Sequence, residues 1–164
     1  MYSLLESVHV LTLSVFLGTL VMMDLRMLGL TLRHVPVGEA ASRLLPWTVA
    51  GFVVMVMTGV LLFYAIPVRS YQSIFFRIKV VLLILAGLNA WHYHRTAHRT
   101  VGQWGADVKT PKTVRVSAIV SLTAWTCVIF AGRFIAYNWF DCDRQPQPPF
   151  VNWAAGCVIE PDSE

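Results

Sequence analysis

The sequence predicts an all-α integral membrane protein, built as a four-helix bundle with a short tail outside the membrane. The 164-residue chain is 56% hydrophobic and 13% charged, about half the charge of an ordinary soluble domain. Its mean hydropathy is +0.60. Four long segments are nearly free of charge, and most basic residues lie between them. No basic run alternates with aromatic residues, so the expected partner is a lipid bilayer and not a nucleic acid.

Each long segment has the length of a membrane-spanning helix, which needs about 20 apolar residues. We expect helices near residues 3–30, 46–66, 71–96 and 114–139. The first lacks the basic start and cleavage site of a signal peptide. The second is expected to begin at Pro46, since proline suits a first helical turn, and to end before Pro67. Arg77, Lys79 and Arg133 interrupt the last two segments.

The distribution of basic residues predicts the orientation. Lys and Arg are concentrated around the loops that follow the first and third segments, at Arg26, Arg33, Arg43, Arg95, Arg99, Lys109, Lys112 and Arg115. Acidic residues dominate the tail over 141–164. Cytoplasmic loops are the ones enriched in Lys and Arg. We therefore expect a multi-pass protein of a bacterial-type inner (plasma) membrane, with both termini periplasmic or extracellular.

The cysteines are consistent with that orientation. Residues 1–140 form the predicted bundle, and Cys142 and Cys157 both lie in the tail that follows it. An oxidising compartment would allow them to pair, closing a loop of about 15 residues that stabilises the fold by ~3 kcal/mol. Two free thiols are the alternative. Cys127, in the middle of the fourth segment, is interpreted as a small packing residue.

Five ionisable residues fall in the outer halves of three predicted helices: Glu6, His9, Arg77, Lys79 and Arg133. Such residues are costly in a membrane and are candidates for function. In one interpretation Glu6 pairs with an arginine and Lys79 extends to the interface. In the other they bind haem b, with His9 as an axial ligand oriented by Glu6 or a backbone carbonyl. Arg77 and Arg133 would then contact the propionates, and Lys79 is a candidate second ligand.

The face of the first helix that carries Glu6 and His9 continues through Phe16 to Asp24. Asp24 marks the charged end of the uncharged run.

The second segment offers other ligands. Met55 and Met57 are candidates because a thioether can be an axial haem ligand. Gly51, Met55 and Gly59 also lie on one helical face, where small residues allow close helix packing.

Histidines gather at the inner side. His94 and His98 share one helical face and could bind a metal or a porphyrin iron. Their aromatic, basic surroundings favour anchoring at the membrane interface instead. His92 lies deeper and is a weaker alternative ligand, and His34 lies in the first inner loop.

Two sequence stretches resemble a known family. They are LLESVHV at 4–10, running on to DLR at 24–26, and FRIKVVLL at 76–83, ending in WHYH at 91–94. They resemble the first and third helices of the HemJ-type protoporphyrinogen oxidases, and more loosely CopD-like copper-resistance proteins. The resemblance implies a b-type haem between these helices, with His9 matching the family's histidine and Lys79 its lysine. Arg77 stands where that family usually carries another histidine.

Three functions follow as hypotheses. The first is a membrane cytochrome that passes electrons between a quinone or porphyrinogen and a periplasmic partner. The second is a non-enzymatic accessory subunit of a larger complex, in a homo- or hetero-oligomer. The third is a CopD-like transporter of copper or a small solute. No phosphate-binding glycine loop or hydrolase motif is present in the sequence, so nucleotide and hydrolytic chemistry have no support.

Overall fold

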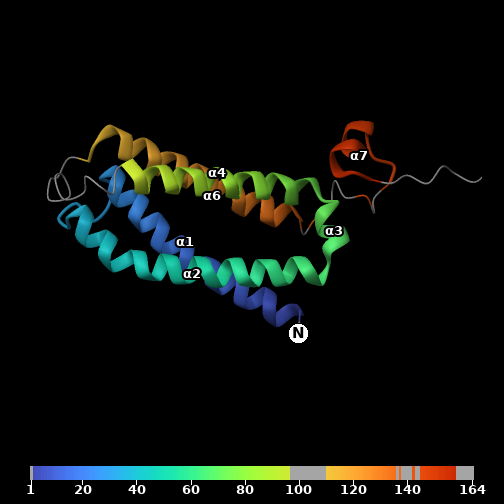
Figure 1. Cartoon of the computed structure of the whole chain (residues 1–164), viewed down its shortest axis with the longest axis horizontal. Helices are drawn as coiled ribbons and strands as arrows, with labels where there is room; N and C mark the ends of the chain where they lie inside the picture. Colours follow the sequence, from blue (N-terminus) through green and yellow to red (C-terminus); the bar gives the residue numbers. More distant parts are fainter. Residues whose placement is uncertain (1, 97–109, 136, 138–141, 143–144, 158–164) are drawn as a thin grey trace, which may run out of the picture.

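The computed structural model describes residues 2–96, 110–135, 137, 142 and 145–157. Over these residues the chain is entirely helical apart from its connections (Figure 1), which confirms the all-α class. The long helices are α1 (Tyr2–Leu28), α2 (Val37–Ala65), α4 (Ile74–Thr96) and α6 (Lys112–Ile135), and the short ones are α3 (Pro67–Tyr71) and α7 (Pro149–Ala155).

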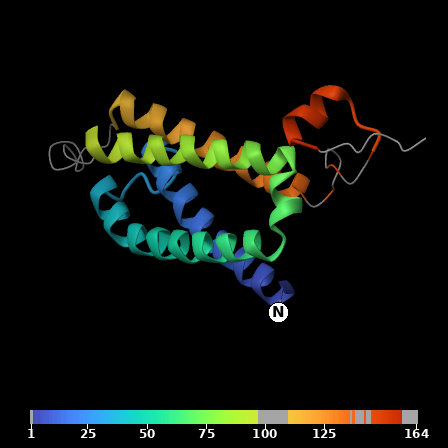
Figure 2. The ribbon, with the colours of Figure 1, turned by 45° about the vertical axis from the view of Figure 1, so that its right-hand side comes forward.

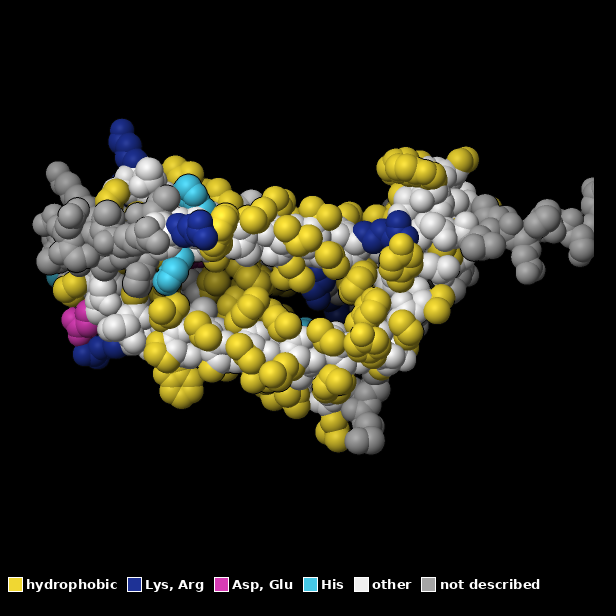
Figure 3. All heavy atoms as spheres, viewed as in Figure 1, with side chains coloured by type: hydrophobic (Ala, Val, Ile, Leu, Met, Phe, Trp, Pro, Cys, Tyr) yellow, Lys and Arg dark blue, Asp and Glu magenta, His cyan; other side chains and the backbone are white. Residues whose placement is uncertain are grey.

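All four long helices are long and apolar enough to cross a membrane. Many large hydrophobic side chains on these helices are exposed, and hydrophobic side chains predominate on the face seen in Figure 3. The protein is therefore a multi-pass membrane protein.

The helices associate as two pairs. α1 packs along α2, α4 packs along α6, and α1 also contacts α6. Figures 1 and 2 show α1 running obliquely, from near α6 to beyond the line of α2. We call the end where α1 connects to α2 the loop end. The opposite end, where α1 begins and α7 lies, is the tail end.

One predicted boundary is wrong. α2 begins at Val37 and not at Pro46, so Pro46 lies inside the helix. Its first turns carry Glu39 and Arg43, which form an i,i+4 ion pair of 2.7 Å. Those charges made the segment resemble a loop, although such pairs support a helix. The other spans differ less: α1 ends at Leu28, and the described part of α6 runs to Ile135, while residues 136, 138 and 139 of the expected span lie outside the described residues.

Two apolar clusters hold the bundle together. The central cluster joins all four long helices and consists of Phe16, Met55, Ala86, Ala124, Trp125 and Val128. The rings of Phe16 and Trp125 meet edge to face with centroids 4.7 Å apart, a favoured aromatic geometry. A second cluster at the loop end consists of Met27, Val37, Val114 and Ala118.

Small and hydroxylated residues bring α1 and α2 together. A Cβ on Gly51 would lie 3.1 Å from the Phe16 Cβ and 3.2 Å from its Cα and N. Beside this contact, Thr48 Oγ1 donates a hydrogen bond of 2.9 Å to Thr19 Oγ1. The small-residue face predicted for α2 is thus confirmed as a helix contact.

α2 and α4 are arranged differently. Figure 3 shows a hollow between them, lined by hydrophobic side chains, with a Lys or Arg side chain visible inside it. α3 links the two helices at the tail end, where Phe63 stacks on Phe76 with centroids 5.3 Å apart.

Candidate functional site

His9 is held on α1 by a residue of α2. Its Nδ1 lies 2.8 Å from Thr58 Oγ1. The Thr58 hydroxyl already donates to α2 carbonyls, to Val54 O at 2.9 Å and to Met55 O at 3.1 Å. A hydroxyl has one hydrogen to donate, so with that hydrogen on an α2 carbonyl the Thr58 oxygen can accept from Nδ1–H of His9. Neutral His9 then keeps the lone pair of Nε2 available for a ligand.

Gly59 makes room for the imidazole. A Cβ at this position would lie 3.4 Å from His9 Cε1 and 3.9 Å from Nδ1. A methyl group at this position would already be in van der Waals contact with the ring. Thr58 and Gly59 together therefore form a seat for His9. Sequence reasoning did not assign this role to Thr58, because it depends on which helix packs against α1.

Lys79 enters the same part of the bundle from α4. Its Nζ lies 3.5 Å from the position of a Cβ on Gly132 of α6, and it interacts electrostatically with His9. Within the described part of the chain, Nζ donates no hydrogen bond. We call the region around His9, Thr58, Gly59, Lys79 and Gly132 the chamber. It lies in the tail-end half of the bundle and brings together the two residues that the sequence singled out most strongly.

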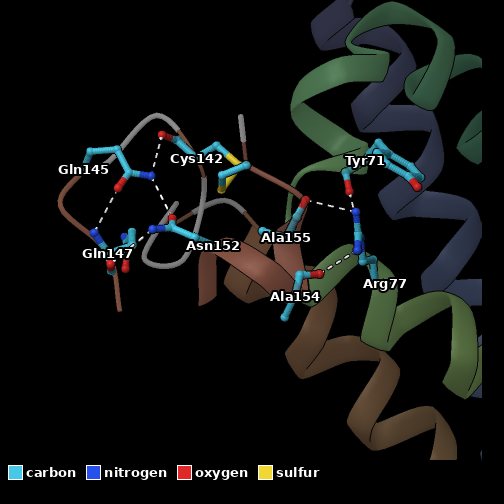
Figure 4. The surroundings of a disulfide bond; sticks show 9 residues. Tyr71, Arg77, Cys142, Gln145, Gln147, Asn152, Ala154 and Ala155 are labelled. Carbon is cyan, nitrogen blue, oxygen red and sulfur yellow. Dashed lines mark hydrogen bonds between the residues drawn. A yellow bond between two sulfur atoms is a disulfide. The ribbon is translucent and has the colours of Figure 1, made fainter. Parts of the chain in front are cut away.

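Arg77 does not join the chamber. Its guanidinium donates to three backbone carbonyls, Tyr71 O at 3.1 Å, Ala154 O at 2.6 Å and Ala155 O at 2.9 Å, as Figure 4 shows. The last two belong to the final turn of α7, where carbonyls lack helical partners. Gly156 ends α7 in the left-handed region at φ +68°, and a Cβ there would lie 3.1 Å from the guanidinium.

The tail is closed by the predicted disulfide. Cys142 and Cys157 are bonded, with an S–S distance of 2.07 Å. Next to them, the Gln145 side-chain amide donates to Asn152 Oδ1 at 2.9 Å. These contacts, drawn in Figure 4, hold α7 against the loop that precedes it.

Glu6 and Arg133 also lie apart from the chamber. Both side chains are exposed. Glu6 borders a shallow open depression with Ser3, Ser7, Val10 and Leu11, and Arg133 lies over the Tyr137 ring at 5.2 Å. The predicted pairing of Glu6 with an arginine is not seen, since the ion pair found among the residues described is Glu39 with Arg43.

The remaining candidate ligands are dispersed. Met55 is buried in the central cluster, whereas Met57 is 62% exposed on the outer face of α2. His92 and His94 are exposed near the end of α4, and His98 lies outside the described residues. No group of three or more His, Cys, Asp or Glu side chains able to hold a metal ion occurs in the described ranges.

A buried carboxyl at the loop end was missed as a site residue. Asp24 is 6% exposed. Ser121 of α6 is its hydrogen-bonding neighbour, and Tyr93 of α4 interacts with it electrostatically. Its place on the same face as His9 was the available signal, but we interpreted the residue as the charged end of a span.

Comparison with known proteins gives one result. Neither the curated proteins nor the solved structures contain a match to this chain. One family model, described as a family of unknown function (DUF6644), matches residues 1–138. The match takes in all four long helices and stops before Cys142. The chain therefore belongs to the DUF6644 family.

Proposed function

We propose that this protein binds a b-type haem in its bundle and has an electron-transfer role, with His9 as an axial ligand. One observation carries the proposal. The His9 imidazole is fixed through Nδ1, which leaves Nε2 as the ligand nitrogen, in a chamber that also contains Lys79. A histidine that ligates a metal usually has its other ring nitrogen held in this way.

The chamber has further properties that suit a haem. The neighbouring hollow between α2 and α4 is lined by hydrophobic side chains (Figure 3), as an apolar macrocycle requires. The donor set of one imidazole and one amine is compatible with a haem iron. Lys79 is the better second ligand, because Met57 points outward and Met55 is packed in the central cluster. The amine would have to lose its proton to coordinate.

The two arginines of the candidate site are not equally available to contact a haem propionate. Arg77 is engaged by the tail, so Arg133 is the remaining cation for a propionate, and it would have to leave the Tyr137 ring to reach one. When bound, the haem would supply a one-electron redox couple. The chain's own residues would position it and keep water away. We propose a quinone or another membrane redox protein as the partner.

The proposal includes an orientation. The loop end carries Arg26, Arg33, Arg43 and Arg95 in the described part of the chain, and the tail end carries the disulfide. The first feature is typical of the cytoplasmic side and the second of an oxidising compartment. We therefore place both termini outward. The resemblance of helices α1 and α4 to HemJ-type proteins supports the same pair, His9 and Lys79.

The test is an absorption spectrum of the purified protein from cells supplied with haem. We expect a Soret band that falls at least tenfold in His9→Ala, a size typical of lost metal-site interactions. His92→Ala is the matched control, since His92 is a histidine at the other end of the bundle and should keep the band. Colourless wild-type protein, or equal bands in wild type and His9→Ala, would overturn the proposal.

The orienting role of Thr58 gives a second test. Thr58→Val removes the hydroxyl that accepts from Nδ1. We expect a tenfold or greater loss of haem affinity with an unchanged circular dichroism spectrum. Thr123→Val is the control, because the Thr123 hydroxyl bonds within its own helix, to Ile119 O.

A second candidate function is an accessory subunit of a larger membrane complex. The observation in its favour is a pair of exposed aromatic side chains on α7, Phe150 at 71% and Trp153 at 79% exposure. Aromatic residues of this kind are common at protein interfaces. Colourless protein that co-purifies with larger partners, and loses them in Trp153→Ala, would favour this function over haem binding.

A further inference from the structure

A carboxyl group is buried at the loop end, and among the described residues no cation pairs with it. Asp24 lies on α1, and its Oδ2 has no hydrogen-bond partner among the residues that the structure describes. The polar groups that act on the carboxyl are the Ser121 hydroxyl of α6 and, through its electrostatic field, Tyr93 of α4. Asp24 is 6% exposed, so the carboxyl is buried where residues of three helices act on it. The chamber at His9 does not include this site, and the haem proposal does not use it.

The neighbouring charges are engaged elsewhere. Arg26 is 2% exposed, but its Nε donates to Val35 O at 2.6 Å. On α2, Glu39 and Arg43 pair with each other. On α6, Lys112 and Arg115 are exposed near the start of the helix. No arginine or lysine of the described ranges forms an ion pair with Asp24.

A charged carboxylate in this position would be expensive. Burying an ion without a partner costs several kcal/mol, and the cost is large for an acidic residue in a membrane span. The acid form carries no charge, and its added hydrogen makes one oxygen a donor. The protein can therefore retain this carboxyl by keeping a proton on it.

We propose that Asp24, Ser121 and Tyr93 form a proton-binding site at the loop end of the bundle, with the Asp24 carboxyl as the proton carrier. The proton comes from water at the loop end and returns to it, so the exchange consumes only a hydronium ion and releases water. The Ser121 and Tyr93 hydroxyls each donate and accept a hydrogen bond. As part of the proposal, we assign them the role of passing the proton between the carboxyl and the loop end.

The experiment compares the infrared spectra of the full-length wild-type protein and its variants in lipid vesicles at neutral pH. We expect a C=O stretching band of a protonated carboxyl that shifts in D₂O. The band should be absent from Asp24→Asn, a variant of nearly the same shape. It should persist in Glu39→Gln, the matched control for a carboxyl that is exposed and paired. Absence of the band from wild-type protein, or its persistence in Asp24→Asn, would overturn the proposal.

Two measurements keep the test decisive if Asp24→Asn does not fold. ¹³C labelling of aspartate side chains should shift the band in wild-type protein, and a band that does not shift would overturn the proposal. Ser121→Ala should move the same band to higher frequency, because the carboxyl loses a hydrogen bond. An unmoved band would overturn the assignment to this site. Replacement of the band by carboxylate bands on adding Na⁺ would identify a cation site instead.

Discussion

The contact between α1 and α2 and the face between α2 and α4 show two ways of using the same helix. Along α1, the second helix presents Gly51 and Thr48 and lies directly against Phe16 and Thr19. Toward α4, it borders the hollow seen in Figure 3 and meets its neighbour through the Phe63–Phe76 stack. Two successive long helices of the chain, here α2 and α4, need not pack along their lengths. Small residues close one contact, and the other contains a hollow.

The largest loss of stability should come from placing a side chain at Gly51, in the contact between α1 and α2. We expect Gly51→Leu to destabilise the protein by about 3 kcal/mol, because its side chain would be forced against the Phe16 backbone. Thermal unfolding in detergent measures this. Gly87→Leu is the matched control, since a Cβ on Gly87 has nothing within 4 Å. If both variants unfold at the same temperature, the contact between α1 and α2 is looser than described.

A smaller loss of stability is expected at the face between α2 and α4. Phe63→Ala removes the stack with Phe76, and the loss of this half-buried ring should cost about 2 kcal/mol. If the protein binds haem as proposed, the substitution should also accelerate haem loss, because the stack joins α2 to α4, the two helices beside the hollow. Phe150→Ala, which changes an exposed ring on α7, should alter neither property. Wild-type haem retention in Phe63→Ala would show that the hollow is closed by other residues.

Removing hydrogen bonds between α4 and α6 should destabilise the bundle less than either of these changes. Asn89 donates through Nδ2 to Ser117 O, and Ser117 Oγ donates to Asn89 Oδ1, each at 3.0 Å. Hydrogen bonds between membrane helices contribute roughly 0.6 to 1.7 kcal/mol. Asn89→Leu should therefore lower the free energy of unfolding by about 1 kcal/mol. Asn152→Leu changes an asparagine of the tail and should leave the unfolding of the bundle unchanged. An equal loss in both variants would contradict a specific role for Asn89.

The smallest effect concerns the ion pair at the start of α2. Arg43→Ala removes the partner of Glu39, and both side chains are exposed. Pairs of this kind contribute at most about 0.5 kcal/mol. We expect no measurable change in unfolding temperature. A shift as large as that of Asn89→Leu would mean that the charged first turns of α2 hold the loop end together.

The sequence predicted the bundle well because membrane spans are read from local hydropathy. It failed at the start of α2, where the charges of Glu39 and Arg43 concealed two turns of helix. His9 and Lys79 could be selected because ionisable residues are conspicuous in apolar segments. The seat formed by Thr58 and Gly59 could not, because Gly59 was selected only as a packing residue and the role of Thr58 depends on α1 lying against α2.

The same reasoning explains the role of Arg77. Its charge predicted a functional residue, but its partners are carbonyls of α7. Backbone carbonyls leave no pattern in a sequence. Only the folded tail shows that this arginine is used to bind it.

This contact also has a consequence for how the chain is made. The guanidinium of Arg77 and its carbonyl partner on Ala154 are 77 residues apart. Synthesis runs from the N-terminus, so α4 is complete long before α7 leaves the ribosome. Until then Arg77 lacks its two α7 carbonyls. The final element of the described chain thus completes the hydrogen bonding of an earlier one, and a protein truncated before α7 would reach the membrane with that arginine bonded to Tyr71 O alone among these three carbonyls.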